Sequence, residues 1–167
     1  MATSDGSTKA DGIDTTPRVQ RAGLPPAIDF GPTSTFRFIA AGGPGLPDFY
    51  EERDQRGDGA PLHSHPWPSW ELVIEGEIRV LVGDDEHVLG AGDAIYLPPD
   101  VPHTYVVESE TAHLVGMNMS NGRFESLQRN AAPLFSGDGA PDMEAVMALA
   151  AEHDVNLIGP PLLPRTG

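Results

Sequence analysis

The sequence predicts an all-β protein, an antiparallel barrel of the jelly-roll type followed by a short C-terminal helix. Two observations carry this prediction. Short runs of aromatic and β-branched residues alternate at period two, as half-buried strands do, and turn sequences rich in Gly, Pro and Asp separate them. Glycine (19) and proline (17) together account for 36 of the 167 residues, which favours many turns and short strands.

The strand-like runs follow one another at short, regular intervals. They cover residues 36–40, 49–52, 72–75, 77–82, 94–97, 103–107 and 113–119. Such spacing is typical of a sandwich or barrel rather than of alternating strands and helices. The length fits one domain, so we expect a flexible tail over 1–26, a barrel over 27–125 and an extension over 126–167.

The hydrophobic period changes to that of a helix only near the end of the chain. Met143, Val146, Met147 and Ala150 follow helical spacing behind Pro141 and Asp142, two residues suited to a helix start. We therefore predict a helix at about 141–153. Its methionines are expected to pack on the barrel or on a second subunit.

Charge and composition limit the partners. The formal net charge of −15 repels nucleic-acid phosphates and anionic membranes, so neither is expected to bind. The absence of cysteine excludes thiolate nucleophiles and thiolate metal ligands, so any metal must be held by imidazole and oxygen. The first 26 residues lack the apolar stretch of a secretory signal, and we expect a cytoplasmic protein.

Two of the six histidines are spaced for a shared ligand. His63 and His65 are two residues apart, so both imidazoles leave one face of an extended strand and can reach one ion. A pair of this kind, taken alone, is more often solvated surface. The other isolated histidines, His87, His113 and His153, are expected to be structural or solvated.

The surrounding sequence gives the histidine pair its context. Gly57, His63-Ser64-His65-Pro66 and the run 72–77 resemble the first motif of the cupin superfamily, and Gly92 to His103 resembles the second. The resemblance spans about 28–124, with a weaker similarity to bacterial single-domain quercetinase-like cupins beyond it. It implies a double-stranded β-helix with His63, His65 and His103 as ligands of one divalent transition metal: Fe, Ni, Mn, Co, Cu or Zn.

One family residue is missing. Cupins usually carry a glutamate ligand shortly after the second histidine, but Ser69 and Trp70 stand there. Glu71 lies two residues beyond Ser69 and therefore on the same strand face. Either Glu71 turns inward, as a metal ligand or a catalytic base, or three imidazoles alone hold the metal and water or substrate completes the shell.

The expected function follows from an open metal site in a partly apolar barrel. Candidate substrate contacts are Trp67, Trp70, Tyr105, Met117 and Met119, although ordinary core packing is the more common role for each of them taken singly. The resemblance implies a metal-dependent dioxygenase acting on a small aromatic or enolisable substrate. The alternatives are a non-redox isomerase, lyase or cyclase, and a non-catalytic binding protein. By analogy with related barrels we expect a homodimer.

Overall fold

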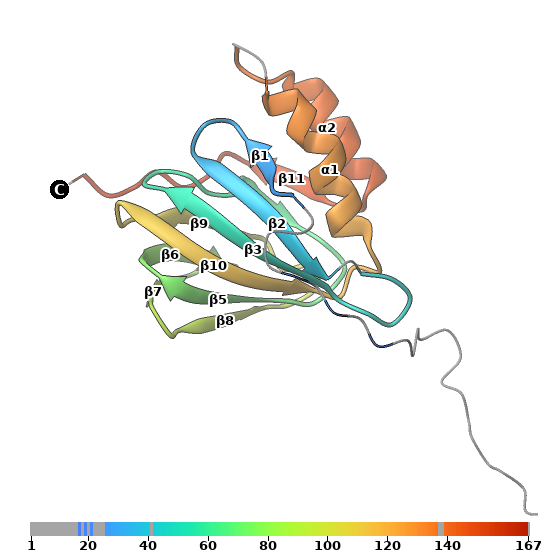
Figure 1. Ribbon diagram of the computed structural model, residues 1–167. Helices are drawn as coiled ribbons and strands as arrows, with labels where there is room; N and C mark the ends of the chain where they lie inside the picture. Colours follow the sequence, from blue (N-terminus) through green and yellow to red (C-terminus); the bar gives the residue numbers. More distant parts are fainter. Residues whose placement is uncertain are drawn as a thin grey trace, which may run out of the picture.

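The protein folds into two antiparallel β-sheets packed face to face, with two helices at one end (Figure 1). The computed structural model describes residues 17, 19, 21, 26–40, 42–136 and 139–166. Most of the predicted tail, 1–26, lies outside these residues. No helix in the described part is long and apolar enough to cross a membrane.

The first sheet has six strands in the order β1-β2-β3-β10-β5-β8. Their bounds are β1 Ile28–Phe30, β2 Ser34–Ala40, β3 Asp48–Gln55, β10 Thr111–Asn118, β5 Ser69–Glu75 and β8 Ala94–Leu97. Buried residues alternate along β3 and β10, so every second side chain points between the sheets. The period-two pattern of the sequence therefore marks the inner face.

The second sheet has five strands in the order β11-β4-β9-β6-β7. Their bounds are β11 Asn156–Gly159, β4 Leu62–Ser64, β9 His103–Val107, β6 Glu77–Val82 and β7 Asp85–Gly90. The jelly-roll architecture is confirmed, but the described strands form two separate sheets rather than one closed wall. His87 lies at an exposed position of β7.

Two helices follow the last long strand, where the sequence predicted one. The predicted helix is α2, Met143–Glu152, and the Asp142 side chain caps it by accepting from the backbone N–H groups of Glu144 and Ala145. The unpredicted helix is α1, Arg123–Phe135. The buried Ser120 hydroxyl accepts from the backbone N–H of Phe124 and so satisfies one donor of its first turn.

Side chains from both sheets and both helices form the core. Val73, Val80, Val107 and Leu114 pack between the sheets, while Phe124 of α1 packs on an aromatic cluster of Phe36, Phe38 and Tyr50. Ala150 of α2 packs against Trp67 and Val155. The α2 methionines do not pack on the barrel, because Met143 and Met147 are about half exposed (52% and 53%) and the small Ala150 makes the buried contact. Their packing on a second subunit stays a prediction.

Candidate metal centre

Pairing of two short strands brings the predicted histidines together. β4 and β9 pair antiparallel with His63 opposite His103, and His65 follows directly after β4. The ring centroids of His63 and His65 lie 4.3 and 4.8 Å from that of His103. One nitrogen from each of the three rings lies within 4.8 Å of the others, a spacing at which they could hold one metal ion.

Backbone carbonyls fix the orientation of each imidazole. The Nδ1 atoms of His63, His65 and His103 lie 2.7, 2.9 and 2.9 Å from the carbonyl oxygens of Pro61, Trp67 and Val101. A carbonyl only accepts, so each Nδ1 carries the hydrogen and each Nε2 keeps a free lone pair. The Trp67 indole also stacks on His65, with centroids 4.6 Å apart and planes 5° from parallel.

Burial keeps the three rings neutral. Desolvation, with the nearby His103 adding repulsion, lowers the pKa of His63 to about 3 and that of His65 to about 4. Desolvation also lowers the pKa of His103. Neutral imidazoles with free lone pairs and hydrogen-bonded Nδ1 atoms are the form in which histidine binds metals. These residues therefore fit a divalent transition metal.

Glu71 lies on the inner face of β5 but outside this group of three nitrogens. Its Oε1 accepts a hydrogen bond from the Tyr50 hydroxyl, whereas its buried Oε2 has no hydrogen-bond partner. Burial raises the pKa of Glu71 to about 7, although the Tyr50 hydrogen bond opposes the rise. A carboxyl group with this pKa can exchange a proton near neutral pH.

A glycine makes the contact between Tyr50 and Glu71 feasible. Gly116 of β10 stands between them in the sheet, paired with Tyr50 on one side and Glu71 on the other. A Cβ atom at position 116 would lie 2.1 Å from Cζ of Tyr50. Without a side chain there, the phenol can cross the central strand and reach the carboxylate.

The histidines and Glu71 line one cavity of about 370 Å³ between the sheets. Phenylalanines from β1, β2 and α1 form an apolar wall: Phe30, Phe36, Phe124 and Phe135. Polar groups interrupt the lining, including Ser69, Thr104 and Asn118. The Ser69 hydroxyl is buried and has no hydrogen-bond partner. Such a cavity suits a small, mainly apolar molecule with a few polar groups.

Of the five residues proposed to contact substrate, the cavity lining includes Tyr105. Trp67 is buried against His65 and donates through Nε1 to Asn118 Oδ1 at 3.0 Å. Trp70 and Met117 are cross-strand neighbours on the outer face, because Ser69, Glu71 and Asn118 occupy the inner one. Met119 follows β10 and is 40% exposed.

A second group of buried carboxyls was not anticipated from the sequence. The Tyr105 hydroxyl lies 2.7 Å from Glu52 Oε1 and 2.9 Å from Asp54 Oδ2. Burial, with Asp54 adding repulsion, raises the pKa of Glu52 well above its usual range. The sequence pattern could have predicted this group, because polar side chains occupy every second position of β3: Asp48, Tyr50, Glu52 and Asp54.

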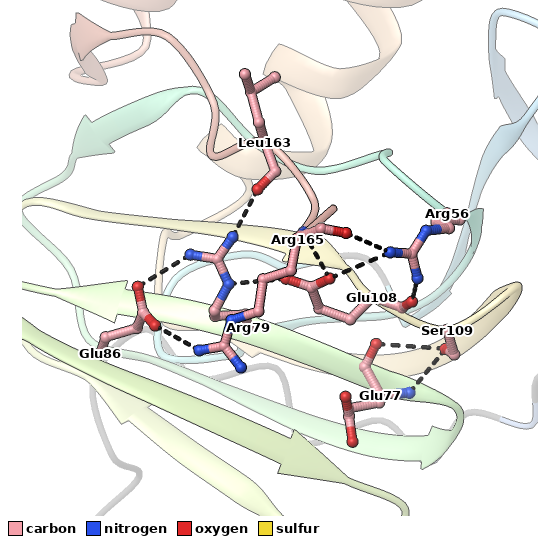
Figure 2. Close-up of polar contacts among 8 residues, drawn as sticks. All are labelled: Arg56, Glu77, Arg79, Glu86, Glu108, Ser109, Leu163 and Arg165. Carbon is pink, nitrogen blue, oxygen red and sulfur yellow. Dashed lines mark hydrogen bonds and ion pairs between the residues drawn. The ribbon is translucent and has the colours of Figure 1, made fainter. Parts of the chain in front are cut away.

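A segment distant in sequence supports the strand that carries His63. β11 pairs with β4, with Leu157 opposite His63, and the next residues, 160–166, run over the outer face of the second sheet. We call residues 160–166 the strap. Arg79 of β6 holds it by donating to the Leu163 carbonyl while pairing with Glu108 at 2.7 Å and Glu86 at 2.9 Å (Figure 2).

The strap contributes its own polar contacts to this network. The backbone N–H of Arg165 donates to Glu108 Oε2 at 3.0 Å, and the Arg165 guanidinium contacts Glu86 at 2.8 Å. Arg56 donates to the Arg165 carbonyl at 2.8 Å (Figure 2). Gly57 belongs to the cavity lining, and a Cβ atom at this position would lie 3.8 Å from Pro164 Cγ. The strap therefore backs one wall of the site.

Comparison with known proteins agrees with this geometry. Residues 50–117 match the family model described as the cupin domain. The chain is 30% identical over 87 residues to quercetin 2,3-dioxygenase of Bacillus subtilis (strain 168), a match that covers 52% of this chain and 23% of that protein. The chain thus spans about a quarter of that enzyme's length.

Two solved structures share the fold at low identity. An RmlC-like cupin from Shewanella frigidimarina matches with a TM-score of 0.53 and 21% identity, covering 62% of this chain and 90% of that one. KdgF from a Halomonas species matches with a TM-score of 0.53 and 18% identity, covering 62% and 94%. With the jelly-roll architecture, these findings show that residues 50–117 form a cupin domain and that the chain has the cupin fold.

Proposed function

We propose that this protein is a metal-dependent oxygenase acting on a small aromatic or enolisable oxygenated substrate. One observation carries the proposal: three convergent neutral imidazoles and a buried carboxyl group with one unpartnered oxygen line the same cavity. His63, His65 and His103 would hold the ion. A bound ion of this kind polarises a ligating oxygen and, if it is redox-active, brings substrate and dioxygen together.

Glu71 is the proposed base. Its Oε1 is occupied by Tyr50, so Oε2 is the oxygen left to take a proton from a substrate hydroxyl or an acidic C–H group. The pKa of Glu71, raised to about 7 by burial, makes it a stronger base than an exposed glutamate while it stays partly ionised at neutral pH. Glu71 is proposed as a base and not as a fourth metal ligand, because it lies outside the group of three histidine nitrogens.

The rest of the cavity orients the substrate. The phenylalanine wall favours an aromatic or otherwise apolar body and excludes water from it. Tyr105 and Thr104 offer hydroxyl groups near His103 on β9. The 30% identity to quercetin 2,3-dioxygenase over 87 residues supports this substrate class.

The proposal is tested by an oxygen pulse. Protein loaded separately with iron, nickel, manganese or cobalt is mixed anaerobically with enolic aromatic compounds, and dioxygen is then added. We expect oxygen consumption with at least one metal, and its loss in Glu71→Gln but not in Glu75→Gln, since Glu75 is exposed on the same strand. If the wild type consumes no oxygen with any of the four metals, the proposal is contradicted.

A non-redox reaction is the second candidate. The Tyr50–Glu71 pair can move a proton without dioxygen, so the same site would support isomerisation, elimination or cyclisation of a chelating substrate. Turnover by the zinc-loaded protein under anaerobic conditions favours this reaction over the oxygenase.

We further propose that two copies of the chain associate. The outer face of β5 and β8 exposes Trp70 (47%), Ile74 (39%) and Tyr96 (43%), and the Trp70 and Tyr96 rings are in contact with centroids 5.2 Å apart. An exposed apolar patch of this kind favours a protein partner. Light scattering should report a dimer for the wild type and a monomer for Trp70→Glu.

A further inference from the structure

A chain of hydrogen bonds connects the candidate metal centre to Glu71. His65 Nδ1 donates to the Trp67 carbonyl at 2.9 Å, and Trp67 Nε1 donates to Asn118 Oδ1 at 3.0 Å. Asn118 Nδ2 donates to the Tyr50 hydroxyl at 3.4 Å, and that hydroxyl donates to Glu71 Oε1. We call Trp67, Asn118 and Tyr50 the relay.

Donor and acceptor chemistry fixes the direction of the relay. An indole N–H only donates, so the Asn118 group facing Trp67 is the carbonyl oxygen, and the amide nitrogen must face Tyr50. The Tyr50 oxygen accepts from that nitrogen, which leaves the single phenolic hydrogen for Glu71. Every donor therefore points toward the carboxylate.

The relay is buried and rigid. Tyr50, Trp67 and Asn118 are only 2–3% exposed, so water does not compete for their hydrogen bonds. Tyr50 is also packed between Phe36, Phe38 and Phe124, with ring centroids 4.9–5.8 Å away. A phenol held in this way cannot follow Glu71 to another rotamer.

We infer that Tyr50 and Asn118 are positioning residues, which hold Glu71 with Oε1 occupied and leave Oε2 as the oxygen that receives the substrate proton. The inference rests on the proposed role of Glu71 as the base. It adds the residues that select which carboxylate oxygen reacts, and it explains why a side chain two positions beyond the usual family glutamate can serve on this face.

The inference predicts how the ionisation of Glu71 responds to change. A hydrogen bond to the charged form favours ionisation, and the Tyr50 bond lowers the pKa of Glu71 against the effect of burial. The titratable groups around it are Tyr50, Glu52 and Asp54 on β3, and Tyr105 with the three histidines on the opposite sheet. Tyr50→Phe removes one hydroxyl and leaves all the other groups in place.

The test measures Glu71 itself. Infrared difference spectra of zinc-loaded protein, with Glu71→Gln as the reference, follow the carboxyl group as pH changes. We expect Tyr50→Phe to move the midpoint upward by about 1–2 pH units, the worth of one hydrogen bond to a charged group, and Tyr96→Phe to leave it unchanged. Tyr96 is the matched control because it is exposed on the outer face.

Asn118→Asp provides a second test, in which the lost hydrogen bond and the negative charge added at position 118 both raise the pKa of Glu71. An aspartate at 118 still accepts from Trp67 but cannot donate to Tyr50, so the phenolic hydrogen turns toward position 118 and leaves Glu71. The Glu71 midpoint should again rise by at least about 1 pH unit. If both variants fold, as judged by near-ultraviolet circular dichroism, and neither moves the midpoint, the inference is overturned.

Activity separates this inference from the proposed function. If the wild type turns over a substrate, the acidic limb of its pH–rate profile should shift upward in Tyr50→Phe by the same amount as the infrared midpoint. If no substrate is found, the infrared result still decides whether the relay positions Glu71. If Tyr50→Phe does not fold, Asn118→Asp and Gly116→Ala, which crowds the Tyr50 ring, carry the same measurement.

Discussion

Replacing Glu71 by glutamine is expected to stabilise the metal-free protein at alkaline pH. Burial raises the pKa of Glu71 from 4.5 to about 7, so folding opposes its ionisation. The stability of the folded state is unaffected by this residue below pH 4.5. Between pH 4.5 and 7, ionisation of Glu71 in the unfolded state progressively lowers the free energy of unfolding. The full reduction persists above pH 7. Glutamine cannot ionise and still offers an oxygen to Tyr50.

The size of the effect follows from the two pKa values. A difference of about 2.5 pH units corresponds to about 3 kcal/mol of unfolding free energy at pH 8. Urea denaturation of the metal-free wild type and Glu71→Gln at pH 4, 6 and 8 measures it. The difference between the two proteins should be close to zero at pH 4 and greatest at pH 8.

Glu75→Gln is the matched control, since it removes the same charge from an exposed position of β5. If Glu75→Gln and Glu71→Gln show the same dependence on pH, burial of Glu71 is not the cause and the reasoning fails. If Glu71→Gln is stabilised but inactive, the base is maintained at a cost to the fold, as expected of a functional group.

Three further outcomes are expected. His103→Ala should weaken zinc binding by more than about 100-fold, measured by competition with a chelator, whereas His87→Ala, in exposed β7, should bind normally; equal affinities would exclude His103 as a ligand. Gly116→Ala should cost about 1–3 kcal/mol in urea denaturation, because its Cβ would collide with Tyr50, and an unchanged midpoint would contradict the close packing. Arg79→Met should lower the midpoint of urea denaturation more than Arg165→Met, since the Arg79 side chain is 9% exposed and that of Arg165 is 59% exposed. It should also expose the strap to proteases, and an intact strap in Arg79→Met would show that other contacts hold it.

The part of the site that lies in two sequence motifs could be predicted. His63 and His65 share a short segment, and the proline-rich turn before His103 starts the strand that pairs with β4. Period two also placed Glu71 on the face of Ser69. These are local properties, fixed by alternation along a strand and by pairing of neighbouring strands.

The residues that were missed depend on contacts between distant segments. Tyr50 reaches Glu71 only because Gly116, on the strand between them, has no side chain. Trp70 was placed in the cavity for its aromatic character, although alternation with Glu71 puts it on the outer face. Helix α1 begins after Gly122, where the Phe124 N–H donates to Ser120, rather than at a strong hydrophobic period, so the sequence did not reveal it.

The pairing of β11 with β4 also bears on how the centre is assembled during synthesis. A nascent chain that ends before Asn156 has made all three histidines, but the edge of β4 beside His63 still lacks its partner. Until then the backbone groups at that edge are open to solvent or to other chains. A ribosome-bound chain of this length should therefore capture zinc weakly, and release of the next dozen residues should mark the moment when the ion is retained.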